Sequence, residues 1–366
     1  MESGMNRVKV GVVGSGGVGL ACAAWTAERS HEVSVWSPRG SADVLRREPL
    51  SATGALEVTL RVGHANSAQE LAEFSDVILI AVPLNGHRMV MDALLPHLRS
   101  GQLVLVSSMA SLSSLYLFEA ARSRGVRVSV ASFGTTILTA RLKQPGQVNI
   151  MTRRGNVSVS CLPRSGLPNA LVACQALFGG GFTAEDNPLI STLANTNAIT
   201  HVPLALFNWT RIERGENWPQ YHFMTPRVAS VIEKLDAERR TIANAFGFHV
   251  RSIDQHFSQS FNTDATRLED IAAELHRMRG GPPGPTDVRT RFLSEDVPFG
   301  LVFLLALGGV ARISTPITEA MITTSGLIVG EDFTAGNNLI ATLELSSESV
   351  DGLLSRVNIA DFSARQ

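Results

Sequence analysis

Short β-branched runs alternate with helical segments through the first half of the chain. In order, the runs are RVKVGVV, HEVSVW, ALEVTLRV, DVILIAV, QLVLVS and VRVSVAS. This alternation predicts a parallel sheet with helices on both faces, a doubly wound α/β domain of the Rossmann type. After Arg141, two alternating runs flank Arg154-Gly155 in QVNIMTRRGNVSVSCL, and they predict an antiparallel hairpin appended to that sheet.

From Asn187 onward, helical periodicity replaces the strand pattern. Asn187 and Thr225 each precede a proline, which places a capping residue before a favoured first helical position. We therefore expect a dinucleotide-binding α/β domain over residues 1–185 and an all-α C-terminal domain over residues 186–366, which binds substrate and carries catalysis. GGPPGP at 280–285 is expected to be a loop within the second domain.

Composition supports this organisation and narrows the partners. A length of 366 residues with 44% hydrophobic and 18% charged residues is typical of a well-packed chain of two domains. The formal net charge is -1 and like charges form no blocks, so we expect a small-molecule partner rather than nucleic acid or a membrane. Charges instead pair locally, as expected for Asp236 and Arg240, four residues apart on a helix.

Cysteine usage and apolar runs bear on the compartment. The three cysteines lie in apolar surroundings without the close spacing of a metal or redox motif, so we expect reduced core thiols and no metal site. FGLVFLLALGGVA at 299–311 is shorter than the roughly 18 to 20 residues that span a bilayer, and we expect a buried helix. MESGMN leads almost directly into a strand and leaves no room for a signal peptide. These features favour a cytoplasmic protein.

The first predicted strand runs into GSGGVG, which opens an alanine-rich helix. Gly14 would allow the tight turn, Gly16 would let the backbone approach a pyrophosphate, and Gly19 would let the helix pack against the strand. The helix N-terminus adds amide donors for the phosphates. A glycine-rich turn also suits a purely structural role, but strand, turn and helix agree here. They predict a dinucleotide site formed by Gly14, Ser15, Gly16, Gly17 and Gly19.

The end of the second strand, in HEVSVWSPRGS, bears on the choice of dinucleotide. NAD-preferring sites usually have an acidic residue there for the ribose 2′-hydroxyl, and this segment has none. Ser37 and Arg39 instead offer a hydroxyl and a guanidinium to a 2′-phosphate, although an ordinary surface turn would use the same residues. We predict NADP as the cofactor, with NAD as the alternative.

Acid–base chemistry has few candidates in the helical half. The chain has only three lysines, which tells against dehydrogenases that use a lysine of the helical domain as general acid. Among nine histidines, His201 has the most unusual setting, because it shares a polar stripe with Asn197 on an apolar helix. Pro203 predicts a kink beside it. A core histidine that caps the freed carbonyl is the competing interpretation.

A second polar group lies in DVRTRFLSEDVPFGLVFLL. We expect Asp296 in the first turn of a helix, where the helix N-terminus keeps it ionised and suits it to stabilise an imidazolium. Arg291, on the approach to that helix, would bind a carboxylate. Capping by Ser294 together with surface charge is the structural alternative.

NTNAITHVP, TPRVASVIEKLDAER and TRFLSEDVPFGL, following an N-terminal GxGxxG, resemble the opine dehydrogenase family, which includes the octopine and nopaline dehydrogenases. QPGQVNI and VSVSCLP extend the resemblance over nearly the whole chain. It implies an NAD(P)-dependent oxidoreductase that condenses an amino acid with a 2-oxo acid, reduces the imine to an N-(carboxyalkyl) amino acid, and runs the reverse oxidation. By resemblance His201 is the acid–base residue, Asp296 its partner and Arg291 a substrate ligand, and we add Asn197 to the substrate site. Many members have proline directly after the histidine, whereas Val202 intervenes here.

Two other functions stay open at this point. A reductase of the ketopantoate or 3-hydroxy acid type would act on a carbonyl without an amine, although the shortage of lysines disfavours it. A sensor would bind NADP without turnover. A homodimer is compatible with each of these functions.

Overall fold

The computed structural model describes residues 7–108, 110–261, 263–279 and 282–362. MESGMN and the first two residues of GGPPGP, on which two sequence predictions rest, lie outside these ranges. The chain divides into unit 1, Met1–Thr192 with Ser355–Gln366, and unit 2, Leu193–Leu354. The sequence pattern assigns the C-terminal segment to the helical domain, but the structure groups it with unit 1. There Arg356 forms two 2.8 Å hydrogen bonds with the Glu119 carboxylate.

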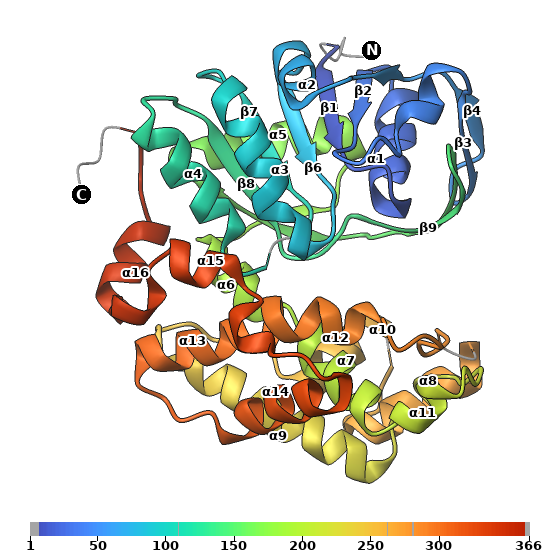
Figure 1. Cartoon of the computed structure of the whole chain (residues 1–366), viewed down its shortest axis with the longest axis vertical. Helices are drawn as coiled ribbons and strands as arrows, with labels where there is room; N and C mark the ends of the chain where they lie inside the picture. The colour runs from blue at the N-terminus through green and yellow to red at the C-terminus, as the bar shows by residue number, and fades with distance from the viewer. Residues whose placement is uncertain (1–6, 109, 262, 280–281, 363–366) are drawn as a thin grey trace. The chain divides into compact units, whose positions relative to one another are not determined.

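Unit 1 contains an eight-stranded sheet with the order β12-β11-β8-β7-β6-β1-β2-β5 (Figure 1). The strands from β8 to β5 run parallel, β11 is antiparallel to β8, and β12 is parallel to β11. The central strands are almost wholly apolar because both faces of the sheet are covered. The strands are β1 (Lys9–Val13), β2 (Glu32–Trp36), β5 (Gly63–His64), β6 (Val77–Ile80), β7 (Leu103–Val106), β8 (Ser129–Phe133), β11 (Val157–Leu162) and β12 (Phe182–Ala184).

Helices cover both faces of this sheet, so the predicted doubly wound domain is confirmed. The core that contains Val10, Val12 and Leu105 also contains residues of α1 and α5. On the opposite face, Gly11 lies against Leu71 of α2, and α3 and α4 continue that layer (Figure 1). The helices are α1 (Gly17–Glu28), α2 (Ala68–Phe74), α3 (His87–Leu94), α4 (Ser113–Ser123) and α5 (Leu167–Phe178). The division between the units falls within α6 (Pro188–Ala194) and α16 (Val350–Val357).

A second sheet, with the order β4-β3-β10-β9, packs on the other side of α1. It consists of β3 (Leu50–Gly54), β4 (Val58–Leu60), β9 (Leu138–Gln144) and β10 (Gln147–Arg153). Because α1 lies between two sheets, all five residues from Leu20 to Ala24 are buried, and the helix is alanine-rich instead of amphipathic. The pattern predicts that ALEVTLRV is a strand of the main sheet, and this is wrong: the segment contains β4 of the second sheet, and the short edge strand β5 begins only after it, at Gly63.

The antiparallel hairpin exists, but the prediction of its turn at Arg154-Gly155 is wrong. β10 pairs with β9, and the turn between them contains Gly146 at φ 76°. β11 instead pairs with β8 in the main sheet. The pattern misses β9 because four of its seven residues are exposed, which leaves little alternation to detect.

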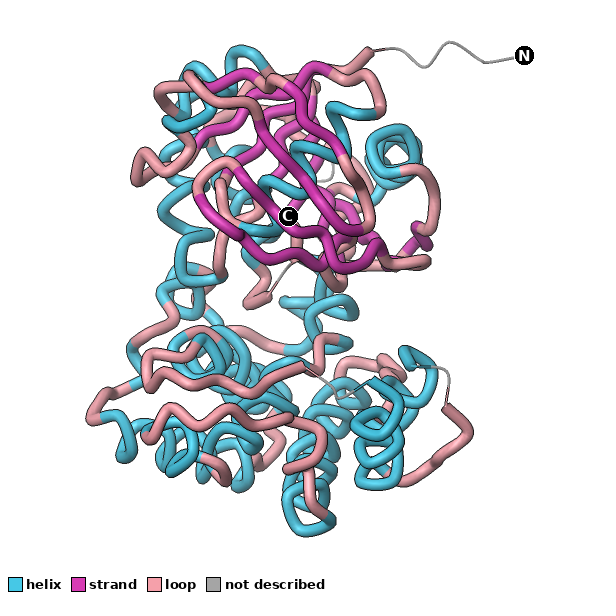
Figure 2. Tube along the Cα trace, turned by 90° about the vertical axis from the view of Figure 1, so that its right-hand side faces the viewer, coloured by secondary structure: helices cyan, strands magenta, loops and turns pink. Residues whose placement is uncertain are grey.

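Unit 2 is helical, and its described part contains no strand longer than the isolated bridge between Pro219 and Pro283 (Figure 2). Its helices are α7 (Asn197–Leu206), α8 (Trp209–Glu213), α9 (Pro226–Ala245), α10 (Ile253–Phe261), α11 (Leu268–Arg279), α12 (Arg291–Ser294), the π-helical η5 (Val297–Leu301), α13 (Val302–Ala311), α14 (Pro316–Val329) and α15 (Asn338–Thr342).

Capping explains where the helices around the start of unit 2 begin. The side chain of Asn187 accepts hydrogen bonds from the backbone N–H groups of Leu189 and Ile190, at 3.1 and 3.2 Å, as its predicted capping role requires. Thr225 precedes α9 as predicted, although its side chain makes no capping bond. The long apolar segment that follows Asn187 is three helices and not one. It breaks first at Asn195, whose side chain accepts a bond from the N–H of Asn197, and again between Leu206 and Trp209.

An ion pair inside unit 2 differs from the predicted one. Asp236 pairs with Arg239, three residues on, and not with Arg240. Both side chains are 2% exposed. The Arg239 guanidinium also donates to the carbonyls of Leu193 and Arg251. The pair therefore connects α9 to the start of the unit and to the loop before α10.

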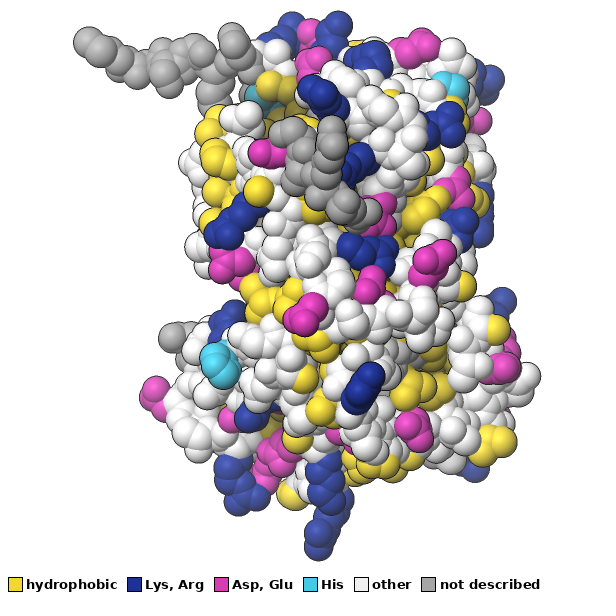
Figure 3. All heavy atoms as spheres, turned by 90° about the vertical axis from the view of Figure 1, so that its left-hand side faces the viewer, with side chains coloured by type: hydrophobic (Ala, Val, Ile, Leu, Met, Phe, Trp, Pro, Cys, Tyr) yellow, Lys and Arg dark blue, Asp and Glu magenta, His cyan; other side chains and the backbone are white. Residues whose placement is uncertain are grey.

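The helical stretch Arg291–Ala311 is long and apolar enough to cross a membrane, by length and composition alone. However, 67% of its apolar window is buried within the protein, which is typical of a core helix and agrees with the predicted buried run at 299–311. It is longer than that run because it begins eight residues earlier. On the face drawn in Figure 3, acidic and basic side chains are interspersed, in keeping with a net charge of -1.

Candidate active site

The glycine motif forms the turn between β1 and α1, and each glycine meets a different constraint. Gly14 has φ 113°, and a Cβ there would lie 2.5 Å from the Ala81 carbonyl oxygen. A Cβ on Gly19 would lie 2.1 Å from the Gly14 carbonyl oxygen, so only glycine lets the helix pack so closely against the turn. A Cβ on Gly16, by contrast, would meet nothing within 4 Å.

This geometry fits a dinucleotide. Gly16 is the residue before the first turn of α1, where free N–H groups favour a phosphate. The open space beside its Cα is where a pyrophosphate would approach the backbone. Gly17 is held from the other side, because a Cβ there would lie 2.7 Å from the Ala140 carbonyl oxygen of β9. The second sheet thus forms part of the wall behind the turn.

The turn after β2 joins the predicted nucleotide residues. The Ser37 hydroxyl oxygen accepts hydrogen bonds from the Ala42 N–H at 2.8 Å and from the Ser41 hydroxyl at 3.1 Å. Ser41 in turn lies 2.6 Å from the hydroxyl of Ser15 in the glycine motif. Ser37 is buried and holds the turn together, whereas Arg39 is exposed and has no ion-pair partner among the described residues. Arg39 is therefore the residue free to meet a phosphate.

In unit 2, His201 on α7 and Asp296 between α12 and η5 form a hydrogen-bonded pair. The distance from His201 Nδ1 to Asp296 Oδ2 is 2.8 Å, and the side chains are 17% and 8% exposed. A carboxylate only accepts, so Nδ1 carries the proton and donates it. Nε2 is then the basic nitrogen, and within the described chain it has no hydrogen-bond partner. The pair thus presents one ring nitrogen that can accept or donate a proton.

Two features bring this pair together across 95 positions of sequence. The first is Gly300, where a Cβ would lie 2.4 Å from the Cβ of Ala198, so α7 and η5 approach as closely as only glycine permits. The second is the π-helical turn that begins directly after Asp296. Asn337 donates to the Pro298 carbonyl at 3.0 Å and satisfies an acceptor within that wider turn.

Phe292 completes the pair, and sequence reasoning missed it. Its ring stacks on the His201 imidazole with centroids 3.9 Å apart and planes 2° from parallel. The ring covers one face of the imidazole and limits its rotation. The available signal was its spacing, since Phe292 lies four residues before Asp296 and so on the same side of a helix.

The helix that carries Asp296 begins earlier than expected. Thr290, and not Ser294, is the capping residue: its side chain accepts from the Phe292 N–H at 3.2 Å. Asp296 therefore lies beyond the first turn of α12 and directly precedes η5.

Pro203 lies within α7, and the helix continues past it to Leu206. The kink beside His201 stays a prediction. Proline has no N–H to donate to the Ile199 carbonyl. The next turn is closed, because Phe207 donates to the Pro203 carbonyl at 3.0 Å. Arg291 and Asn197 are both exposed. Asn197 is one helical turn before His201, and Arg291 directly precedes Phe292, so both side chains are available to a ligand beside the pair.

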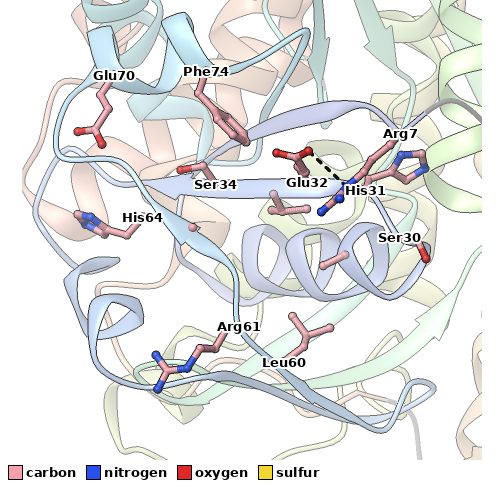
Figure 4. A pocket seen from close by; sticks show the side chains of 13 residues that line it. Arg7, Ser30, His31, Glu32, Ser34, Leu60, Arg61, His64, Glu70 and Phe74 are labelled. Carbon is pink, nitrogen blue, oxygen red and sulfur yellow. Dashed lines mark ion pairs between the residues drawn. The ribbon is translucent and has the colours of Figure 1, made fainter.

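A groove of about 880 Å³ in unit 1 contains none of these residues. It is lined by side chains from α2, β2 and β5, and Figure 4 shows Arg7 paired with Glu32 inside it, at 3.3 Å. His64 is bound by Asp43, and Glu70 by Asn66. These polar groups are bound by other protein groups, and we do not assign the reaction to the groove.

In comparison with known proteins, the two halves of the chain match different family models. Residues 184–329 match the family model of the NAD/NADP octopine/nopaline dehydrogenase alpha-helical domain, and residues 10–164 match that of ketopantoate reductase PanE/ApbA. An opine dehydrogenase of Arthrobacter sp. (strain 1C) is 29% identical, over 94% of this chain and 98% of its own. A D-nopaline dehydrogenase of Agrobacterium vitis is 25% identical, over 86% and 84%.

Solved structures agree with the fold. An octopine dehydrogenase with NADH and L-arginine has a TM-score of 0.80 at 17% identity, and covers 98% of this chain and 100% of its own. A yersinopine dehydrogenase with bound NADP+ has a TM-score of 0.70 at 16% identity, over 96% and 98%.

Proposed function

The chain belongs to the opine dehydrogenase family, and from this premise we propose that His201 and Asp296 carry out the acid–base chemistry of its reaction. The protein is an NAD(P)-dependent oxidoreductase that acts on CH–NH bonds. It condenses an amino acid with a 2-oxo acid, reduces the imine to an N-(carboxyalkyl) amino acid, and catalyses the reverse oxidation. Its substrates are small molecules.

The observation that carries the proposal is the 2.8 Å bond between His201 Nδ1 and Asp296 Oδ2, which leaves Nε2 without a partner in the described chain. Nε2 accepts the proton that the substrate ammonium must lose before its nitrogen can attack the carbonyl carbon. The imidazolium then returns this proton to the hydroxyl group of the carbinolamine, which leaves as water and yields the iminium. Asp296 stabilises the charged ring throughout, and Phe292 holds its orientation.

When bound, the dihydronicotinamide supplies the hydride that reduces the iminium carbon. The residues that would hold the dinucleotide are Gly14, Ser15, Gly16, Gly17 and Gly19. The amine nitrogen of the product then takes up one proton from solvent, which balances the reaction. Arg291 would bind a substrate carboxylate, because it is exposed and directly precedes Phe292, whose ring stacks on His201.

The test is a matrix of amino acids against pyruvate, 2-oxoglutarate and glyoxylate, in which NADPH and NADH oxidation is followed and products are identified by mass. We expect oxidation only when amine and oxo acid are both present, and strong loss of turnover in His201→Ala with NADPH binding nearly intact. Oxidation without an amine would favour a carbonyl reductase, to which the PanE/ApbA match over residues 10–164 points. Wild-type turnover in His201→Ala would exclude the assigned role.

We propose NADP as the preferred dinucleotide, supported by the unpaired, exposed Arg39 at the end of β2 and by the lack of an acidic residue in the turn SPRGS. A charge-assisted bond is worth about 1.5 to 3 kcal/mol, so Arg39→Gln should raise the KM for NADPH by roughly 10-fold to 150-fold. The KM for NADH should stay within about twofold. A wild-type preference for NADH would contradict this choice.

Two expectations from the sequence remain proposals. Three buried free thiols support a reducing compartment such as the cytoplasm, which fractionation of the native cells would test. A homodimer is the commonest closed assembly of soluble enzymes, and sedimentation equilibrium would test it.

A further inference from the structure

Arg154 lies at the carboxyl edge of the main sheet, outside the residues assigned so far. Its backbone N–H donates to the Ile137 carbonyl at 2.9 Å, and its side-chain Nε–H donates to the Thr136 carbonyl at 2.8 Å. Both carbonyls belong to the loop that leaves β8 after Phe133. The antiparallel strand β11 begins at Val157, just beyond the same end of β8. Arg154 is thus fixed at the end of β8 by two short bonds.

The charge of Arg154 is unmatched. Its side chain is half-buried, and burial is the sole cause that lowers the pKa of its guanidinium. No carboxylate lies within ion-pair distance in the described ranges. Of five N–H groups, only the Nε–H donates to a described acceptor. A half-buried charge without a carboxylate partner is a candidate for binding an anionic ligand.

Other buried arginines of the chain show what a structural role requires. Arg239 is bound by the Asp236 carboxylate and by two carbonyls. Arg153, the neighbour of Arg154, donates to the carbonyls of Phe178, Gly179 and Gly180. Each has its donors directed at protein acceptors. Arg154 keeps its planar fork open, which is the geometry that binds a carboxylate or phosphate with two parallel bonds.

Its place on the sheet indicates which anion it meets. The glycine turn follows β1, and the residues for the adenosine ribose follow β2. The nicotinamide half of a bound dinucleotide would therefore extend in the other direction, toward β6 and β7. β8 is the third strand from β1 in that direction, about 14 Å away at 4.8 Å per strand. That distance places Arg154 beyond the pyrophosphate, where the reacting substrate belongs.

We propose that Arg154 binds one of the two substrate carboxylates. This inference rests on the proposed function, because an N-(carboxyalkyl) amino acid carries a carboxylate on each side of its secondary amine. One guanidinium neutralises only one of them. A second guanidinium, that of Arg154 at the nicotinamide end of the sheet, neutralises the other carboxylate. The substrates are thereby defined as two carboxylates rather than an amine and a neutral carbonyl compound.

Kinetics of Arg154→Gln and Arg154→Lys test the proposal with each carboxylate substrate and its amide, pyruvate against pyruvamide and alanine against alaninamide. We expect Arg154→Gln to raise the KM of one carboxylate substrate at least about tenfold, with no effect on its amide. Arg154→Lys should fall between, because it keeps the charge and loses the fork. The Kd for NADPH should stay within about twofold. Arg124→Gln is the matched control, since this exposed arginine follows α4 at the opposite edge of the sheet.

Equilibrium binding keeps the proposal testable apart from turnover. Iminodiacetate has two carboxylates flanking a secondary amine, and sarcosine has one. With NADP+ present, iminodiacetate should raise the melting temperature of the wild type and of Arg124→Gln, but much less that of Arg154→Gln. Sarcosine should affect all three equally.

The carboxylate site is overturned if iminodiacetate stabilises the wild type and Arg154→Gln equally. It is also overturned if iminodiacetate stabilises neither protein. A rise in the Kd for NADPH with unchanged substrate KM values also overturns it, because Arg154 would then bind a phosphate of the dinucleotide. Failure of the proposed function looks different: the wild type would lack amine-dependent turnover with every substrate pair, while the iminodiacetate result would still decide the role of Arg154.

Discussion

Replacing Asp296 with asparagine changes the charge of the carboxylate and almost nothing else. The two side chains have the same shape, so the stacked Phe292 ring and the close approach at Gly300 remain. The amide can still accept the Nδ1–H of His201 through its oxygen. It can also turn over and donate its NH2 group, which would leave the proton on Nε2 and remove the base.

The magnitude follows from the 2.8 Å bond and from its burial, since Asp296 is only 8% exposed. A hydrogen bond to a charged group contributes about 1.5 to 3 kcal/mol, and a neutral one about half as much. The charged bond matters most when the ring becomes an imidazolium during proton transfer. If the substitution loses the whole charged contribution at that stage, kcat falls by roughly 10-fold to 150-fold.

The assay is steady-state NADPH oxidation with saturating amino acid and 2-oxo acid, beside fluorescence titration of NADPH. We expect kcat to fall as stated and the Kd for NADPH to stay unchanged. Asp332→Asn is the control, because this exposed aspartate only caps Thr334 in the same unit. A kcat for Asp296→Asn within twofold of wild type, with folding intact, would refute the role of the pair.

Four further outcomes follow from contacts already described or from neighbouring ones. Phe292→Leu should lower kcat by roughly 2-fold to 12-fold, since ring stacking contributes about 0.5 to 1.5 kcal/mol, and an unchanged kcat would show that the stack is idle. His87 is buried and its pKa is lowered to about 4, chiefly by burial. The unfolded chain therefore binds more protons between about pH 6.5 and 4, and stability falls as pH falls through that window, by about 3 kcal/mol in full; urea unfolding against pH should show a flatter profile for His87→Gln. Glu238 accepts bonds from the N–H groups at the start of α14, at 2.7 and 2.8 Å, so Glu238→Ala should lower the free energy of unfolding by about 2 kcal/mol, with equal stability counting against it. Burial raises the pKa of all three thiols, so iodoacetamide at pH 8 should label them only after unfolding, and rapid labelling of the native protein would contradict their burial; they are Cys22, Cys161 and Cys174.

The sequence predicts most reliably what depends on local constraints. The glycine turn needs only a strand, three glycines and a helix in succession, and the Asn187 cap needs only one side chain and two N–H groups. The fold class and the reaction are confirmed, and the helical half matches the family model of the octopine/nopaline dehydrogenase alpha-helical domain over residues 184–329. The catalytic roles of His201, Asp296 and Arg291 stay predictions, although the structure does bring the first two together.

Long-range pairing is where the pattern fails, and each failure has a physical cause. Gly146 and Gly155 both lie in plausible turns, and only the burial of β11 against β8 decides which turn closes a hairpin. The Phe292 stack depends on the cap at Thr290, where the helix starts. The sequence offered Ser294 as a second capping residue, and the pattern alone did not distinguish the two. Asp236 has arginines three and four residues on, and the buried carbonyls select the nearer one.

The return of Ser355–Gln366 to unit 1 gives the chain an unusual connectivity. In topological terms unit 2 is an insertion: a nucleotide-binding fold is interrupted after Thr192 and resumed at Ser355. The Asn187 side-chain amide donates to the Asn358 side-chain oxygen at 3.0 Å, and the Ile359 carbonyl accepts the Arg164 N–H at 2.8 Å. The C-terminal segment is thus hydrogen-bonded to the N-terminal part of unit 1. A protease that trimmed the C-terminus would therefore damage the cofactor half of the enzyme and not the helical half that directly precedes the cut.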